Sequence, residues 1–202
     1  MYAHTSPSYV VGVDVGGTKI ATLLVDQRRQ VCGHLTVATD LTSPQHTLTC
    51  IIDAIRATLR QGNVEPERLR AIGLGIPGQV VPTTGVVKLA VNLGWDAMPV
   101  GALINAAFGV PCVLENDVRA AAWGLYRMGH VDDAQSLAYV SIGTGIAAGL
   151  VLDGRVYRGW SGMAGEIGHS CVDPSGPRCA CGQHGCLEAM AAGPAIAALA
   201  AE

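Results

Sequence analysis

The sequence has few aromatic residues, few charged residues and no long apolar run. Aromatic residues make up 4% of the 202 positions and charged residues 14%, and the net charge is −3. Such a charge gives no basic surface for nucleic acid, so we expect no nucleic-acid partner. No apolar run approaches the roughly 20 residues of a membrane-spanning helix, so we also expect no membrane partner. The first residues lack the basic and apolar regions of a secretory signal. With seven cysteines, this indicates reduced thiols and a cytoplasmic location.

Small and apolar residues are abundant instead. Half of the residues are hydrophobic, and glycine occurs 26 times. This composition is typical of an α/β protein with many tight turns. A chain of this length suits one large domain or two smaller lobes.

Apolar segments and turn residues alternate along the chain, which predicts alternating strands and helices. The clearest helix begins at Ser43 and Pro44, an N-cap followed by a proline, and ends at Gly62. Expected strands cover residues 9–15, 20–25, 31–38, 70–76, 111–114, 136–142 and 146–152, and further helices cover 99–108, 117–128 and a segment after Pro194.

Two segments of the chain resemble each other. VDVGGTKIATLLVD (13–26) and VSIGTGIAAGLVLD (140–153) share Val, Gly, Ala, Leu and Asp at one constant offset. Each copy reads as strand, glycine turn, strand, although chance supplies some matches in a chain rich in valine and glycine. Together with the polar stretch 125–133 between the copies, the repeat predicts two related lobes, residues 1–124 and 125–202.

Both glycine turns are candidate phosphate sites. Glycines let backbone N–H groups approach an anion closely, and a neighbouring carboxylate and lysine would serve a hydrated metal ion and a phosphate. The alternative for each turn is an ordinary hairpin, and the Walker spacing is absent. The candidate residues are Asp14, Gly16, Gly17, Thr18 and Lys19 in the first turn, and Gly143, Thr144 and Gly145 in the second.

Residues 159–188 form an irregular segment with four soft metal ligands: His169, Cys179, Cys181 and Cys186. Three thiolates and one imidazole are the donor set of a closed, structural zinc site. The segment has little apolar content of its own, so metal binding would supply its folding energy. Disulfides or idle cysteines are the alternative, which the lack of a secretory context disfavours.

Several polar residues could bind a substrate. Asp117 follows an expected strand, where it could act as a general base or simply cap the next helix; the residues alone do not separate these roles. Asn92 and Trp95 could contact a sugar hydroxyl and ring face, with Trp95 in the core as the commoner alternative. Glu166 and Glu188 would be held around a polyol by the metal loop, or be solvated loop charges.

Taken together, these motifs resemble the ROK family (repressors, open reading frames and kinases), which includes bacterial glucokinases. The resemblance spans residues 10 to 193, and its most specific part is Cys-x-Cys-Gly-x-x-Gly-Cys-x-Glu. The other parts are Asp14-x-Gly-Gly-Thr-Lys19, Glu115-Asn-Asp117, Gly143-Thr-Gly145 and Gly165-Glu-Ile-Gly-His169.

The resemblance implies an actin-like ATPase (ribonuclease H-like) fold of two lobes, with sugar and ATP in the cleft between them. It makes Asp117 the catalytic base, the two glycine turns the holders of the ATP phosphates, and a homodimer the usual assembly. The implied sugar-binding residues are Gly78, Asn92, Asn116, Asp117, Glu166, His169 and Glu188.

We therefore expect an ATP-dependent hexose kinase that uses Mg²⁺ and a structural Zn²⁺, with glucose phosphorylated at O6. The short segment before the Asp14 motif favours the kinase branch, because ROK repressors carry a winged helix-turn-helix there. Family members have longer chains, so the second lobe is expected to be incomplete. The alternatives are a non-catalytic sugar-binding regulator, an inactive fragment and, ranked last, a chaperone-type ATPase. The motifs do not identify the hexose.

Overall fold

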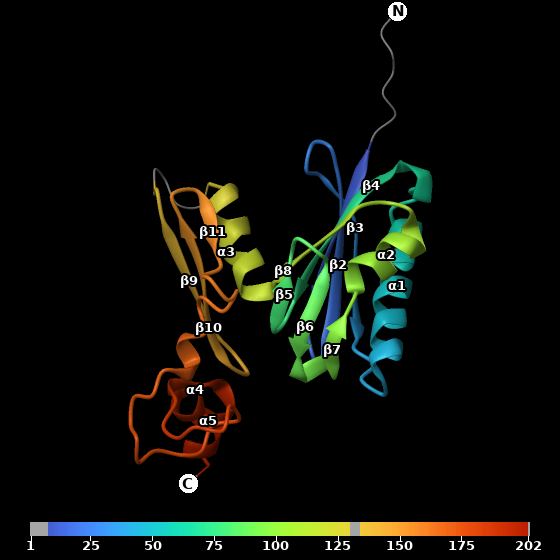
Figure 1. The fold of residues 1–202 in the computed structure, drawn as a ribbon. Coiled ribbons are helices and arrows are strands. Elements are labelled where there is room, and N and C mark those ends of the chain that lie inside the picture. The colour runs from blue at the N-terminus through green and yellow to red at the C-terminus, as the bar shows by residue number, and fades with distance from the viewer. Residues whose placement is uncertain (1–7, 130–133, 202) are drawn as a thin grey trace, which may run out of the picture. The chain divides into compact units, whose positions relative to one another are not determined.

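The computed structural model describes residues 8–129 and 134–201, which form two compact units, residues 1–117 and 118–202 (Figure 1). The sequence analysis placed the boundary between the two lobes later, after residue 124. The compact units do not test that boundary, which stays a prediction. Residues 130–133 of the polar stretch lie outside the described residues.

The first unit is built on a five-stranded sheet with the order β3-β2-β1-β4-β8. Strands β1 (Tyr9–Val15), β2 (Lys19–Asp26) and β3 (Val31–Ala38) form an antiparallel meander. Strands β4 (Leu69–Ile76) and β8 (Cys112–Asn116) run parallel to β1. All five strands were expected from the sequence. Because β1, β4 and β8 are parallel, their carboxyl ends meet at one edge of the sheet.

Helices α1 (Pro44–Gln61) and α2 (Val100–Phe108) cover one face of this sheet (Figure 1). Strand β1 alternates strictly, so that Val11, Val13 and Val15 point into the core. The apolar stripe of α1, including Ile51 and Ile55, packs against them. The expected helices 43–62 and 99–108 are confirmed.

Helix α1 starts at the predicted cap. The Ser43 hydroxyl accepts a hydrogen bond from the His46 N–H at 3.2 Å, and Pro44 is the first helical residue. Ser43→Ala should lower the free energy of unfolding by about 1 kcal/mol, because the N–H loses its acceptor. Chemical denaturation measures this change. Ser43→Asn keeps an acceptor and should cost less than Ser43→Ala; equal losses would contradict the cap.

A second, smaller sheet in the first unit was not expected. It consists of β5 (Gln79–Val81), β6 (Val86–Ala90) and β7 (Trp95–Met98), with a 3-10 turn, η2 (Val91–Leu93), before the last strand. Trp95 is 1% exposed, and its indole N–H donates to the Pro44 carbonyl at 3.2 Å. The core interpretation of Trp95 is therefore correct, and its ring face is not available to a sugar.

Within its described residues, the second unit contains a three-stranded antiparallel sheet and three α-helices. The sheet has the order β11-β10-β9, with β9 (Leu137–Ile142), β10 (Ile146–Leu152) and the unexpected β11 (Arg155–Tyr157). Helix α3 (Asp117–Arg127) packs on β10 at Gly149, where an added Cβ would collide with the helix. Two short helices follow the cysteine loop, α4 (Leu187–Ala191) and α5 (Gly193–Leu199).

The internal repeat corresponds to two similar hairpins. Strands β1 and β2 pair antiparallel up to Val15 and Ile20, and β9 and β10 pair antiparallel up to Ile142 and Ile146. Each pair is joined by one of the glycine turns. The repeat in the sequence therefore reflects one supersecondary motif used once in each unit.

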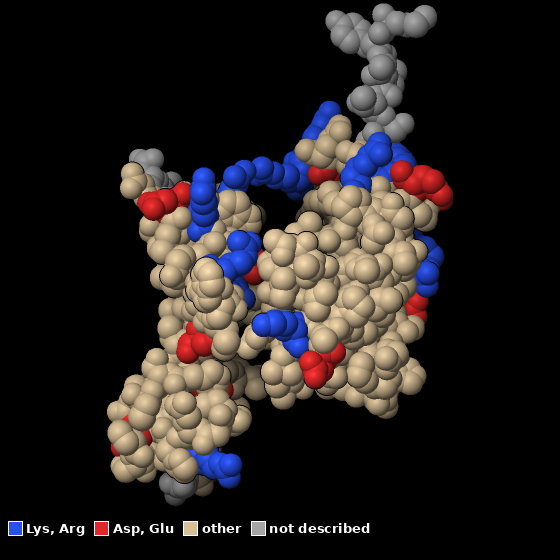
Figure 2. All heavy atoms as spheres, in the orientation of Figure 1, with Lys and Arg blue, Asp and Glu red and all other residues tan. Residues whose placement is uncertain are grey.

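Charges are sparse on the surface, as the composition predicts. Figure 2 shows that most of the visible surface carries neither acidic nor basic residues. Within the described part of the chain, no helix is both long enough and apolar enough to cross a bilayer.

Candidate functional site

In the first unit, the candidate catalytic residues lie at the carboxyl edge of the parallel strands. Asp14 pairs with Gly75 of β4, and Gly75 pairs with Glu115 of β8, so the three residues form one row across the sheet. Neighbouring strands are about 4.8 Å apart, which puts the backbones of Asp14 and Glu115 about 10 Å apart. Asp117 follows at the end of β8, and a Cβ on Gly75 would lie 3.4 Å from its Cα. Gly75 thus leaves room for the start of α3.

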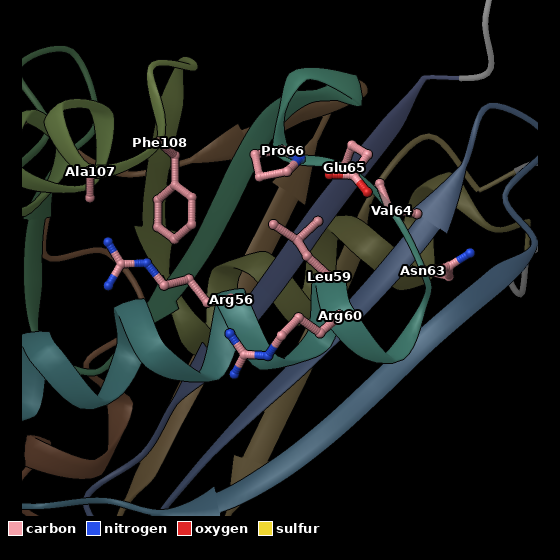
Figure 3. Close-up of a pocket in the computed structure, with 9 residues that line it drawn as sticks. All are labelled: Arg56, Leu59, Arg60, Asn63, Val64, Glu65, Pro66, Ala107 and Phe108. Atoms are coloured by element: carbon pink, nitrogen blue, oxygen red, sulfur yellow. The ribbon is translucent and has the colours of Figure 1, made fainter.

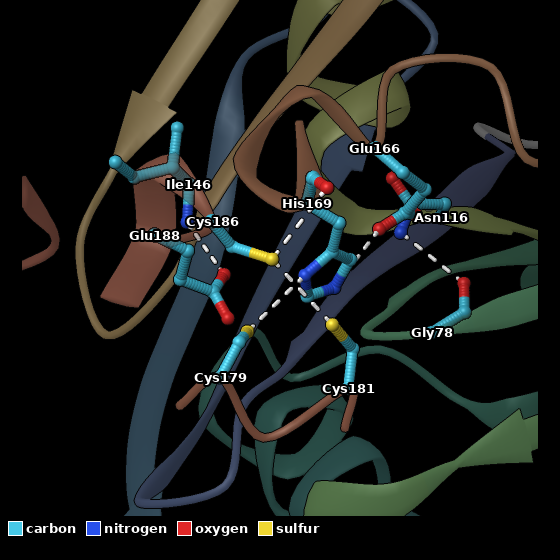
Figure 4. Close-up of polar contacts among 9 residues, drawn as sticks. All are labelled: Gly78, Asn116, Ile146, Glu166, His169, Cys179, Cys181, Cys186 and Glu188. Carbon is cyan, nitrogen blue, oxygen red and sulfur yellow. Dashed lines mark hydrogen bonds and ion pairs between the residues drawn. The ribbon is translucent and has the colours of Figure 1, made fainter. Parts of the chain in front are cut away.

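Asn116 is tied to the loop that follows β4. Its Nδ2 donates to the Gly78 carbonyl at 3.3 Å (Figure 4), and its own backbone N–H donates to Glu115 Oε1 at 3.0 Å. Gly78 has φ of +95°, and a side chain there would collide with the Leu89 carbonyl. The structure therefore brings together two of the predicted sugar-binding residues and fixes the backbone just before Asp117.

The first glycine turn lies at the same edge of the sheet. The Gly16 N–H donates to the Lys19 carbonyl at 2.8 Å, and the Thr39 hydroxyl donates to the Gly16 carbonyl at 2.7 Å. A Cβ on Gly17 would lie 3.7 Å from the Cβ of Asn92, so Asn92 lies beside the turn. Thr18 and Lys19 are exposed and available to a ligand.

In the second unit, the four predicted metal ligands come together. All four donor atoms lie within 4.8 Å of one another. The Cys181 and Cys186 sulfurs are 3.6 Å apart, and His169 Nδ1 is 3.7 Å from the Cys179 sulfur (Figure 4). Zinc bonds of about 2.3 Å to sulfur and 2.1 Å to nitrogen give tetrahedron edges of about 3.5 to 3.8 Å. The two measured distances therefore match edges of such a tetrahedron, and the donor set is one that suits a zinc ion.

The loop geometry that builds this cluster depends on glycines. The Cys179 N–H donates to the Gln183 carbonyl at 2.7 Å, and the Gly182 N–H donates back to the Cys179 carbonyl at 3.0 Å. Gly182 and Gly185 have φ of +93° and +64°, and a side chain at Gly185 would collide with the Asp173 carbonyl. Such backbone favours glycine strongly. The CGQHGC sequence thus closes one tight turn around the thiols.

The thiols differ in their surroundings. Cys186 is fully buried, and burial raises the pKa of its thiol to about 12. Cys181 is exposed, and a hydrogen bond with the Gln183 backbone lowers its pKa. A buried thiol with no cation beside it holds its proton, whereas binding to a metal ion replaces that proton.

His169 also connects the cluster to Glu166. Its Nδ1 faces the thiols, while its Nε2 is 4.0 Å from Glu166 Oε2. Both side chains are a little over one-third exposed. A metal bound at Nδ1 would therefore fix the ring with its second nitrogen towards the carboxylate.

Glu188 contacts the second glycine turn, which the sequence did not reveal. Its Oε2 accepts the Ile146 N–H at 2.9 Å (Figure 4), and an added Cβ on Gly145 would collide with the carboxylate. The Gly143 N–H donates to the Gly145 carbonyl at 2.9 Å, closing the turn, and Gly143 and Thr144 are exposed.

One further residue was missed. Arg119 is 3% exposed on the first turn of α3, and its Nη1 donates to the Gly162 carbonyl at 2.8 Å. It thereby ties the segment before Glu166 to the helix. An arginine in the first turn of an alanine-rich helix gives no sequence signal for such a contact.

A pocket of about 460 Å³ in the first unit lies away from all of these residues (Figure 3). It lies between the last turns of α1 and α2 and the loop that leads into β4, and the Arg56 guanidinium is 5.8 Å from the Phe108 ring centre. None of the predicted site residues lines it. We therefore place the candidate site at the motif residues.

Comparison with known proteins first defines the class of fold. The structure of a ROK family glucokinase from Streptomyces griseus, in complex with glucose and AMPPNP, matches with a TM-score of 0.77 and 35% identity. The match covers 94% of this chain and 59% of that one. The α/β fold is that of the actin-like sugar kinases.

The chain belongs to the ROK family, whose model matches residues 10–202. The glucokinase of Streptomyces coelicolor is 36% identical over 186 residues, which are 92% of this chain and 57% of that protein. A ROK family transcriptional regulator, a homologue of the E. coli MLC protein, matches with a TM-score of 0.86 and 29% identity, over 96% of this chain and 49% of that one. The chain thus spans less than two thirds of the length of these relatives.

Proposed function

We propose that the chain carries the catalytic site of an ATP-dependent hexose kinase that transfers the γ-phosphoryl group of Mg-ATP to O6 of glucose. Support comes from the glucokinase relatives and from the fold shared with a glucokinase bound to glucose and AMPPNP. The observation that carries the proposal is the position of Asp117. It follows β8 at the edge where Asp14 and the first glycine turn also lie.

Asp117 would be the general base. As the hexose hydroxyl attacks the γ-phosphorus, an O–P bond forms, the bond to the ADP oxygen breaks, and the carboxylate accepts the hydroxyl proton. The bond between Asn116 and Gly78 fixes the backbone before this residue. The family resemblance assigns hexose binding to the amides and backbone of Gly78, Asn92 and Asn116, and to the side chains of Glu166, His169 and Glu188.

The two glycine turns would hold the ATP phosphates. The exposed residues Thr18, Lys19 and Thr144 would supply a hydroxyl, a positive charge and backbone N–H groups. Asp14 would orient hydrated Mg²⁺, which neutralises charge on the phosphates when it is bound.

The cysteine cluster would hold a structural Zn²⁺. His169 Nδ1 and three sulfurs would supply its four ligands, which would leave no position for a reacting water. A cytoplasmic location, where thiols stay reduced, is part of this proposal.

The direct test measures ADP formation from Mg-ATP in a coupled assay, with glucose, N-acetylmannosamine and other hexoses offered separately. We expect turnover with glucose and release of glucose 6-phosphate. Turnover with another hexose alone would support the proposed kinase activity but replace glucose as the substrate. No turnover with any hexose, from folded and zinc-loaded protein, would overturn the enzymatic proposal.

A second candidate is a sugar-binding regulator without kinase activity. The high TM-score with the ROK transcriptional regulator favours it. Such a protein should bind a hexose in calorimetry while it consumes no ATP. The same assay, paired with a binding titration, therefore separates the two functions.

A further inference from the structure

Glu188 lies two residues beyond Cys186, the last thiol of the metal cluster. Cys186 occupies the N-cap of α4, and Glu188 is in the first turn of that helix. The Leu187 N–H donates to the Ser170 carbonyl at 3.0 Å, so the start of α4 is joined to the residue after His169. The segment that carries His169 and the segment that ends at Cys186 thus both meet at the start of α4, and together they fix the position of the Glu188 backbone.

The carboxylate of Glu188 reaches from there to the base of the second glycine turn. Oε2 accepts the Ile146 N–H at 2.9 Å and packs closely against Gly145, where an added Cβ would meet the carboxylate. A second contact comes from the next helix, because the Gly193 N–H donates to the Gly143 carbonyl at 2.8 Å. A Cβ on Gly193 would lie only 2.9 Å from that oxygen. The segment after the cluster therefore holds both ends of the turn.

The rest of the turn is open. Gly143 and Thr144 are exposed, while Ile146 at its base is buried. A turn that binds phosphate through backbone N–H groups works best when those groups are already oriented. The contacts of Glu188 and Gly193 fix the base of the turn and leave its tip available.

We propose that Glu188 is a positioning residue for the Gly143–Gly145 turn, and that it makes nucleotide affinity depend on the metal at the cysteine cluster. This rests on the proposed function, in which that turn binds ATP phosphates. Without metal, the cluster segment loses its fixed geometry, α4 shifts, and the Ile146 N–H loses its acceptor.

The test measures the dissociation constant of Mg-AMPPNP by calorimetry for wild type, Glu188→Ala and Glu188→Gln. Glu188→Ala should weaken binding on the order of tenfold, the size expected for a lost hydrogen bond to a charged group. Glu188→Gln keeps an oxygen acceptor and should stay within about threefold of wild type. If charge repulsion between Glu188 and phosphate dominated instead, both variants would bind more tightly, which would overturn the proposal.

Metal removal supplies the coupling test. Zinc stripping with phenanthroline should weaken nucleotide binding in wild type by about the same factor as Glu188→Ala, and should add little in that variant. Fully additive effects of stripping and substitution would overturn the link between metal and turn.

Glu166→Ala is the matched control, because the Glu166 carboxylate lies 4.0 Å from His169 Nε2, whereas the turn is bonded to Glu188 and Gly193. It should weaken hexose binding and leave the affinity for Mg-AMPPNP unchanged. If Glu188→Ala behaved in the same way, Glu188 would be a sugar ligand only, and the proposal would be wrong.

Hydrogen exchange tests the hydrogen bond between the Ile146 N–H and Glu188 in the absence of nucleotide. The Ile146 amide should exchange faster in Glu188→Ala and after metal removal, and at the wild-type rate in Glu166→Ala. If wild type binds no nucleotide, the proposed function fails, and so does the inferred effect of Glu188 on nucleotide affinity. The exchange rate of the Ile146 amide still tests whether Glu188 and the metal hold the turn in place. An unchanged Ile146 exchange rate, both in Glu188→Ala and after metal removal, would overturn this positioning role.

Discussion

Replacing Asp117 with asparagine should lower the kcat of hexose phosphorylation by about a thousandfold and leave hexose affinity nearly unchanged. A general base contributes roughly 10² to 10⁴ in rate, and an amide cannot accept the hydroxyl proton. The shape and hydrogen-bonding reach of the side chain stay the same, so a bound sugar keeps its contacts. The coupled ADP assay measures kcat, and calorimetry measures the affinity.

Asparagine also separates the two roles that the sequence left open. Asn and Asp cap helices about equally well, so a residue that only starts α3 should tolerate the change in both stability and turnover. Asp53→Asn, the same chemical change on the exposed side of α1, is the matched control. Its ion pair with Arg56 is exposed and contributes little, so turnover should be unaffected. Wild-type turnover in Asp117→Asn would remove this residue as the base.

The larger elements could be predicted because local signals agree with the tertiary fold. Strand β1 is rich in valine and ends at a glycine turn, and α1 combines an N-cap, a proline and an apolar stripe. The metal cluster was also predictable, because a turn such as CGQHGC brings thiols together whatever surrounds it. In these cases short-range chemistry decides the geometry.

The small sheet β5-β6-β7 was missed for a physical reason. Its strands have three to five residues, and positive φ at Gly85 and Gly94 sets the turns around them. Such short runs carry no periodicity, and their pairing depends on partners elsewhere in the fold. The contact of Glu188 with Ile146 was missed similarly, because 42 residues separate the two in sequence. Spacing alone predicts ligands of one ion, but not which backbone N–H a carboxylate reaches.

Cys186→Ser should abolish metal binding and destabilise the segment of residues 159–188. Within this segment, the buried residues are Gly168, Cys179, Gly185 and Cys186. Two glycines and two thiols bury little apolar surface, so burial contributes little to the stability of this segment. A structural metal supplies folding energy to such segments directly, and a serine hydroxyl is a poor ligand for zinc.

Wild-type protein purified without chelator should contain one zinc ion per chain, and Cys186→Ser less than about a tenth of that amount. The melting temperature should fall by about 10 °C. Cys171→Ser is the matched control, because Cys171 is an exposed thiol of the same segment outside the cluster. It should keep its zinc and its melting temperature. Metal analysis by mass spectrometry and calorimetric melting decide the outcome. Equal zinc content in both variants would show that the four clustered side chains do not form the metal site. The proposed coupling between this metal and the Gly143–Gly145 turn would then also be wrong.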